Sequence, residues 1–461
     1  MSTEQQELSW QAHPLRELLR LTWPIAVSTL SYSIMTLVDT LLVGHLGPSA
    51  LAGVGLAGTA TFAVLCFSIG LLRGCKTLVS QAVGARRPDL VNAYRAAALG
   101  AAVVLGVLTV GVGQIVAELL VHLSATPAAG EAARTYLHIR NLVAPIVLVG
   151  VALREVGYAE GDSQSPMLAT IGANLVNVTL AVLFVFGLHR GVAGAATATA
   201  IASVLETAIL WWLSARRGVR VGRASFVHVR ELWRIGLPTA LQFMLEIGSF
   251  TLLASMISSL SETQMAAHQI ALQVCQFSFL PAWAVAEAAS VMAGQAIGAR
   301  REALVMPVAR LGLWTAGGYT ALASPIFWFG APMIVAGFTP NAALATVAVR
   351  LLRVAAVFQL FDGANIVGRS ILRGVGDVRF AAVVGVVTAW LMTPPLTWLL
   401  GWHAGLGAFG GWVGLCGETI IGAFIIWHRL VRGGWRKIAA ATRQATELPA
   451  ADVEPALVAN G

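Results

Sequence analysis

Long apolar runs, separated by short polar or basic segments, make up most of this 461-residue chain. Each run has about 20 residues or more, enough for a helix to cross a hydrocarbon core of about 30 Å. Backbone groups in lipid must bond within their own segment, and the runs lack the apolar–polar alternation of a β-barrel. The pattern predicts an all-α integral membrane protein with twelve transmembrane helices, at roughly 21–43, 54–80, 91–120, 136–158, 167–187, 192–213, 232–260, 266–293, 304–337, 345–371, 380–400 and 406–428.

The chain contains two tandem copies of one unit. RELLRLTWP at 16–24 returns as RELWRIGLP at 230–238, and QAVGARR at 81–87 returns as QAIGARR at 295–301. Both pairs have the same offset of 214 residues (230 − 16 and 295 − 81). Six helices in each copy make the copies parallel in the membrane, and paired copies are typical of alternating-access transporters. We therefore expect two pseudo-symmetric six-helix lobes, with the first helix equivalent to the seventh and the fourth to the tenth.

These repeats predict the boundaries of the domains. The predicted segments are a cytoplasmic N-terminus (1–15), an N-terminal lobe (16–213), a cytoplasmic linker (214–229), a C-terminal lobe (230–430) and a cytoplasmic tail (431–461).

Composition and charge agree with a membrane protein. Charged residues make up 11% of the chain, against about 25% in soluble domains, and the mean hydropathy is +0.76. The net charge of +8 comes from Arg and Lys in the loops after every second helix, and such loops stay in the cytoplasm. We expect both termini to be cytoplasmic in a bacterial inner membrane, and topology explains the basic loops better than nucleic-acid binding does. The cysteines at 66, 75, 275 and 416 are isolated, so no disulfide or zinc site is predicted.

Three carboxyl side chains, Asp39, Glu246 and Asp362, lie within predicted membrane helices, where a charge is costly. None has an Arg or Lys within one helical turn, so the sequence does not predict a local salt bridge. One interpretation is a buried carboxyl kept neutral by hydrogen bonds. The other is a site for protons or cations, because a desolvated carboxylate binds a proton more tightly and can exchange it for a cationic ligand.

Glu246 and Asp362 belong to different helices of the same half, and we expect them to face one shared cavity. Together with Gln242, one turn before Glu246, they would hold one proton or one Na⁺. The positions equivalent to the two acids in the first half are Tyr32 and Leu148, so ion coupling should be asymmetric.

Amides and two further charges complete the candidate residues. Asn174 and Asn177 share a helix face and must bond either a neighbouring helix or a ligand. Arg73 and Glu287 are repeat equivalents of opposite sign, and they would pair across the halves as a gate or extend to the membrane interface.

Several motifs resemble one family. VDTLLVGHLGPSALAGVGLA (38–57), QAVGARR (81–87), AAHQIALQ (266–273) and FQLFDGANIVGRSILRGVGD (358–377) are similar to the multidrug and toxic compound extrusion (MATE) family, over about 16–430. Glu246 and Asp362 resemble the NorM-type branch rather than the DinF-type branch. Charged Lys76 and Glu287 depart from the family pattern.

This resemblance implies an inner-membrane antiporter that exports amphipathic cationic drugs by alternating access, in exchange for Na⁺ or H⁺. It implies an N-terminal site with Asp39 and Asn174 and a C-terminal cation site with Glu246 and Asp362, where Na⁺ would bind if it is the coupling ion. We expect no cofactor, no partner beyond small molecules and the lipid bilayer, and a monomer.

Two other classes of protein are alternatives. A flippase for lipid-linked oligosaccharides has a related architecture but would be expected to line its cavity with Arg or Lys. A membrane enzyme would need a nucleophile and a base, and the sequence contains no such motif.

Overall fold

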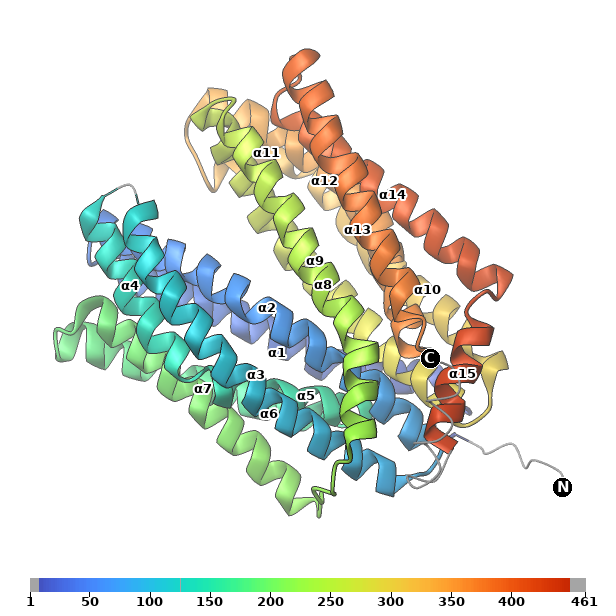
Figure 1. Cartoon of the computed structure of the whole chain (residues 1–461). Coiled ribbons are helices and arrows are strands. Elements are labelled where there is room, and N and C mark those ends of the chain that lie inside the picture. Colours follow the sequence, from blue (N-terminus) through green and yellow to red (C-terminus); the bar gives the residue numbers. More distant parts are fainter. Residues whose placement is uncertain (1–7, 125, 448–461) are drawn as a thin grey trace, which may run out of the picture. The chain divides into compact units, whose positions relative to one another are not determined.

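The computed structural model describes residues 8–124 and 126–447, and every regular element in these ranges is helical. Figure 1 shows long helices and short connections throughout. The elements are α1 (Pro14–Gly44), α2 (Pro48–Gly84), α3 (Pro88–Leu123), α4 (Pro127–Leu142), α5 (Ala144–Ala159), α6 (Gln164–Val182), η1 (Leu183–Gly187), α7 (Gly191–Arg216), α8 (Phe226–Ser258), α9 (Glu262–Gly298), η2 (Glu302–Leu304), α10 (Val305–Phe329), α11 (Ala331–Ala336), α12 (Ala342–Gly374), α13 (Val378–Leu396), η3 (Thr397–His403), α14 (Ala408–Arg432) and α15 (Arg436–Glu447).

The helices agree with the twelve membrane spans that the sequence predicts. Among the described residues, 10 helices are long and apolar enough to cross a membrane, and the bent pair α4–α5 makes an eleventh span. The helix α10 has 25 residues, about 37 Å, which also suffices for a hydrocarbon core of about 30 Å. It follows α9 as α3 follows α2, and it completes the predicted twelve. Large apolar side chains such as Ile115, Leu322 and Phe424 are exposed on the helix surfaces, as expected for contact with lipid.

The repeat extends to the ends of the helices. The bounds of α9 are those of α2 moved by 214 residues, and the same offset relates α13 to α6. The helices α6 and α13 each continue into a π-helical segment, η1 after α6 and η3 after α13. After α2 and α9 the chain adopts the left-handed conformation at equivalent arginines, Arg86 (φ 53°) and Arg300 (φ 58°). The two copies of the sequence therefore form the same helices in the same order.

One predicted helix differs from its counterpart. The run predicted at 136–158 is two helices, α4 and α5, bent by 56°, whereas the equivalent α12 is continuous. Pro145 lies at the start of α5, and its ring and missing N–H interrupt a helix. The equivalent residue in α12 is Gln359, which has an N–H and accepts a hydrogen bond from Ser278 Oγ at 2.5 Å. The run predicted at 304–337 is likewise divided, into α10 and α11, at Gly330.

The chain folds into two compact units. The N-terminal lobe comprises Pro24–Val83 and Arg87–Ala240. The C-terminal lobe comprises Leu241–Glu447, Gly84–Arg86 and the described residues up to Trp23. These units differ from the sequence repeats, because the first turns of α1 belong to the C-terminal lobe and the first turns of α8 to the N-terminal lobe.

The exchanged helix ends are well packed in the lobe that receives them. Leu18 of α1 is fully buried in a C-terminal core with Ala288 and Met292 of α9. In the N-terminal lobe, Gly236 of α8 lies so near α2 that a Cβ would be 2.1 Å from the Leu71 carbonyl oxygen. Only glycine permits this approach of the two backbones.

Close packing in the C-terminal lobe depends on small residues. The central helix α12 packs against α9, α10 and α14, and α13 lies beside α14 (Figure 1). A Cβ at Gly374 of α12 would lie 2.3 Å from the Ser290 carbonyl oxygen of α9. Small residues allow membrane helices to approach closely and to gain van der Waals contact. This packing fixes the positions of the polar side chains on α12.

The predicted cytoplasmic tail contains a helix that was not predicted. The helix α15 covers Arg436–Glu447, and Arg443 Nη1 donates to Glu302 Oε1 at 3.0 Å. The remainder of the tail, from 448, and the first seven residues of the predicted N-terminus lie outside the described residues.

Candidate functional site

Four side chains from two helices of the C-terminal lobe form a network around Glu246 of α8. Arg369 of α12 donates from Nη1 to Glu246 Oε1 at 2.7 Å, forming an ion pair. Gln242, one turn before Glu246, donates from Nε2 to the same oxygen at 2.8 Å. Arg373, one turn after Arg369, donates from Nη2 to Gln242 Oε1 at 3.1 Å. One carboxylate oxygen therefore accepts two hydrogen bonds.

Two more carboxyl groups act on this network. Asp362 lies two turns before Arg369 on α12 and interacts electrostatically with Arg369 and Glu246. Glu418 of α14 interacts with the same groups and accepts a hydrogen bond from Thr393 Oγ1 at 2.6 Å. We call these five charged residues the C-terminal cluster: Glu246, Asp362, Arg369, Arg373 and Glu418. With three carboxyls and two guanidiniums, its formal charge is −1 when every group is ionised.

A glycine on α13 makes room for the cluster. A Cβ at Gly385 would lie 2.6 Å from Glu246 Oε1, 2.7 Å from Gln242 Nε2 and 2.9 Å from Arg369 Nη1. Any larger residue would collide with all three groups. Because Gly385 has no side chain, the backbone of α13 can lie directly against the ion pair.

The ion pair is partly accessible. The exposed fractions of the side chains are 15% for Arg369 and 26% for Glu246. A charge pair is much stronger in a low-dielectric environment than in water, and each partner becomes costly if the other is removed. The arrangement keeps a charged carboxylate in a membrane helix and still leaves it within reach of a ligand.

The acid of the N-terminal lobe has different surroundings. Asp39 of α1 is buried and accepts a hydrogen bond at Oδ2 from Thr199 Oγ1 of α7 at 3.2 Å. Its other oxygen, Oδ1, makes no hydrogen bond to the described residues. Arg140 acts on Asp39 through its charge, but its guanidinium donates to Ser203 Oγ at 3.1 Å. Asp39 therefore has no ion-pair partner in the part of the chain that the structure describes.

The two asparagines of α6 have different environments. Asn174 donates from Nδ2 to Ser31 Oγ of α1 at 2.8 Å, which is a helix–helix hydrogen bond. Asn177 is 0% exposed and lies beside Asp39. Neither polar atom of the Asn177 amide has a hydrogen-bond partner among the described residues. Buried amides without partners are rare, so Asn177 is the asparagine whose surroundings favour a polar ligand.

The two residues of the predicted gate belong to different lobes, and their pairing stays a prediction. Arg73 belongs to the N-terminal lobe, and the buried Glu287 belongs to the C-terminal lobe. Neither residue is without an interaction partner. The unusual charge of Lys76 is balanced within its own lobe, because Lys76 Nζ lies 3.3 Å from Glu155 Oε2 and both side chains are buried.

Three charged residues were missed as parts of a site. Glu246 has no local ion-pair partner, in agreement with the sequence, but it pairs with Arg369 of another helix, which the sequence did not predict. Arg373 lies in the last turn of α12 and donates a hydrogen bond to Gln242. Arg369 follows Asp362 by two turns on one helix face, so the spacing along α12 is the signal in the sequence that points to it. Its partner on α8 is 123 residues away, and Glu418 is also distant in sequence, so only the fold brings them together.

The fold and these sites define a class: a multi-pass membrane transporter built from two repeats, with ionisable groups inside each lobe. The MatE family model matches residues 24–183 and 238–399. The chain belongs to the MatE family, as the motifs predicted, and it is a transporter rather than an enzyme.

Relatives and solved structures support this assignment. A protein of Pseudomonas putida named probable multidrug resistance protein NorM is 32% identical over 422 residues, covering 87% of this chain and 90% of that protein. The multidrug resistance protein NorM of Burkholderia vietnamiensis is 31% identical over 430 residues, covering 89% and 92%. The outward-facing structure of a multidrug resistance MATE family transporter of the MOP superfamily superposes with a TM-score of 0.85 at 22% identity, covering 92% and 97%.

Proposed function

We propose that this protein is a multidrug exporter that moves amphipathic monovalent cations out of the cytoplasm in exchange for protons. The observation that carries the proposal is the C-terminal cluster, whose formal charge is −1. A site of charge −1 inside a membrane becomes neutral when it holds one positive charge. A proton on one carboxyl and a lipophilic cation beside that carboxylate are two ways to supply this charge, and they exclude each other.

Sodium is the less favourable coupling ion for this site. Oxygen atoms are the ligands of hard cations, but Glu246 Oε1 already accepts hydrogen bonds from Arg369 and Gln242. A proton needs only one free carboxyl oxygen, and Asp362 or Glu418 supplies it. We therefore favour proton coupling over the sodium alternative that the sequence left open.

Asp39 would take part in coupling within the N-terminal lobe. With Thr199 as a hydrogen-bond donor and Asn177 beside it, the carboxyl has polar neighbours in either protonation state. Its unbonded Oδ1 supports a role in accepting a proton or a polar group of the substrate. The predicted asymmetry follows: one lobe uses a single acid, and the other uses a cluster.

The setting of the transporter is also proposed. The basic loops support an inner-membrane location with both termini cytoplasmic, and two complete six-helix lobes in one chain support a monomer. The curated relatives are named for multidrug resistance, which supports amphipathic drugs as substrates.

A lipid-linked oligosaccharide flippase is the second candidate, and the arginines of the cluster favour it. A pyrophosphate would need guanidinium groups that are free to bind it. Arg369 and Arg373 are directed at a carboxylate and an amide, and three carboxyls outnumber them. An anionic substrate would be repelled, so export of cations fits this site better.

Ethidium efflux from proteoliposomes tests the function and the coupling ion together. Efflux would be driven by a proton gradient in one arm and by a sodium gradient at equal pH in the other. We expect the proton gradient alone to drive efflux. The matched control is Glu118→Gln, which removes an exposed carboxyl outside both sites and should retain efflux. Efflux driven by sodium alone would contradict proton coupling, and no efflux in either arm would contradict drug export.

A further inference from the structure

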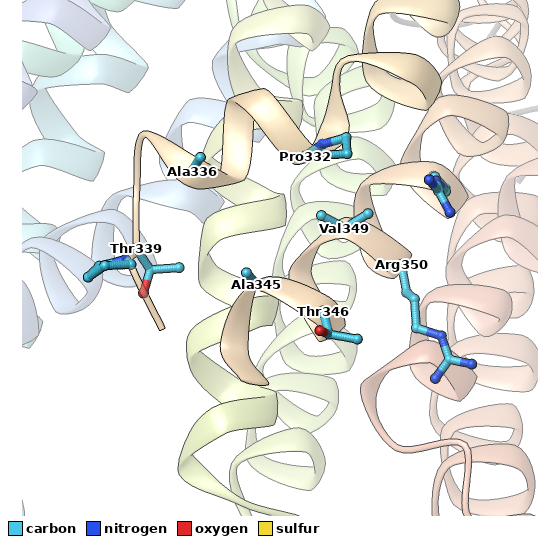
Figure 2. Close-up of a pocket in the computed structure, with 9 residues that line it drawn as sticks. Pro332, Ala336, Thr339, Ala345, Thr346, Val349 and Arg350 are labelled. Carbon is cyan, nitrogen blue, oxygen red and sulfur yellow. The ribbon is translucent and has the colours of Figure 1, made fainter. Parts of the chain in front are cut away.

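A groove on the C-terminal lobe contains two arginines that neither candidate site uses. The groove has a volume of about 660 Å³ and lies between α11 with the segment after it and the first turns of α12. Figure 2 shows Pro332 and Ala336 on one side and Thr346, Val349 and Arg350 on the other. An adjoining cavity of about 420 Å³ shares Arg350 and Arg353 and is lined by Trp328, Val357 and Phe409.

Arg350 and Arg353 are a matched pair. They are three residues apart on α12, so their side chains share one helix face, and both are exposed. Among the described residues, no carboxylate lies within ion-pair distance of either guanidinium. The equivalent residues of the first repeat are Tyr136 and Ile139, so the pair is specific to the C-terminal lobe.

The depth of the pair suits a lipid headgroup. The 33 residues of α12 span about 50 Å, which exceeds a hydrocarbon core of about 30 Å by some 10 Å at each end. Arg350 lies roughly 12 Å from the start of the helix, near the boundary between headgroups and acyl chains, and Arg353 lies roughly 17 Å from it, about one helical turn deeper. Side chains on a helix lean toward its N-terminus, so both guanidiniums point toward the nearer headgroup layer.

The walls below the arginines suit an acyl chain. Trp328 and Val357 are exposed apolar side chains in the cavity that shares the arginines, and Phe409 adds an aromatic wall from α14. Around the groove, Phe329 and Met333 expose about four fifths of their surface, as expected for residues that face lipid (79% and 84%). The site therefore combines a cationic end with an apolar channel open to the membrane.

We propose that this groove is a binding site for one anionic phospholipid of the leaflet at the N-terminal end of α12. The guanidiniums of Arg350 and Arg353 would hold the phosphate, and one acyl chain would lie along Trp328, Val357 and Phe409. Basic pockets between membrane helices recognise anionic headgroups in this way, and Arg forms two parallel hydrogen bonds to a phosphate. A soluble anion would bind the arginines but would leave the apolar channel unused.

Native mass spectrometry of the delipidated full-length protein, titrated with phosphatidylglycerol or phosphatidylcholine, tests the site. We expect the double variant Arg350→Gln/Arg353→Gln to bind phosphatidylglycerol about tenfold more weakly than the parent, because it loses charge-assisted hydrogen bonds. Phosphatidylcholine should bind the parent more weakly than phosphatidylglycerol. The matched control is Arg134→Gln, because Arg134 is an exposed arginine on α4 that pairs with Glu131, and it should bind like the parent.

A second measurement locates the lipid and does not depend on the arginine variants. Phosphatidylglycerol with brominated acyl chains should quench the fluorescence of the parent more than that of Trp328→Phe. Equal binding of the parent and the double variant, or equal binding of the two lipids, would overturn the proposal. Displacement of phosphatidylglycerol by inorganic phosphate at equal concentration would also overturn it, since it would mark a site for soluble anions.

Discussion

The two lobes share one fold but treat their membrane acids differently. In the N-terminal lobe, Asp39 has one hydrogen bond, from Thr199, and no ion pair among the described residues. In the C-terminal lobe, Glu246 is bonded to Arg369 and Gln242 and belongs to a five-residue cluster. The two copies of the sequence thus form similar helices, and the additional charged residues of the second copy form the C-terminal cluster.

The difference indicates that the lobes depend on their acids for different reasons. A carboxylate paired with a guanidinium contributes to stability as well as to function, because its loss leaves an unpaired charge. A carboxyl that has only a hydroxyl partner contributes little to stability, so its presence inside a membrane helix points to function. The substitutions below test this contrast, in order of the expected loss of stability.

Glu246→Gln should have the largest effect. It leaves Arg369 without its carboxylate, which should cost about 3 kcal/mol and lower the Tm by roughly 6–12 °C. Export should be lost. Adding Arg369→Gln should restore much of the Tm without restoring export. Thermal unfolding in detergent and ethidium efflux measure the two effects, and a Tm of Glu246→Gln equal to that of the parent would show that the ion pair contributes nothing.

Gly385→Ala should have an intermediate effect. The added methyl would lie 2.6 Å from Glu246 Oε1, so the side chains of the network must shift. Because these atoms are the ends of flexible side chains, the loss of stability should be at the low end for overpacking, about 1 kcal/mol, and export should fall. Gly318→Ala on α10 is the control, since no atom lies within 4 Å of its added Cβ, and it should leave both Tm and export near those of the parent. Equal behaviour of the two variants would argue against close packing on the cluster.

Asp39→Asn should change stability by no more than about 0.5 kcal/mol, because it keeps the size and the hydrogen bonding of the side chain. It should nevertheless weaken export, since the ionisable group is gone. Drug resistance of a sensitive host, with expression checked by immunoblot, is the measurement. Full resistance would return Asp39 to the interpretation of a carboxyl held neutral by hydrogen bonds.

Asn177→Leu should have the smallest effect on stability. The amide makes no hydrogen bond to the described residues, so an apolar side chain of similar size should leave the Tm unchanged or raise it. Efflux should fall if Asn177 contacts an ion or substrate. Asn174→Leu is the comparison, because it breaks the bond to Ser31 and should lower the Tm. A Tm loss at Asn177 as large as that at Asn174 would assign Asn177 a structural role.

The sequence predicted the twelve helices and the repeat because long apolar runs and a constant offset leave few alternatives. It missed the break between α4 and α5, since Pro145 alone does not show whether a membrane helix bends or stops. The acids Asp39, Glu246 and Asp362 stand out because charges are rare in membrane helices. The residues around them do not stand out in the sequence. Arg369 and Glu418 come near Glu246 only through the packing of α8, α12 and α14.

The most direct test of the central claim is the number of protons released when the protein binds a lipophilic cation. Purified protein in weakly buffered detergent would be titrated with tetraphenylphosphonium while a pH indicator reports released protons. Under the proposal the C-terminal cluster holds one proton before binding and loses it when the cation takes its place. We therefore expect about one proton released for each cation bound, and the same count when sodium is added or left out. Binding without proton release, or binding that only sodium reverses, would contradict the account.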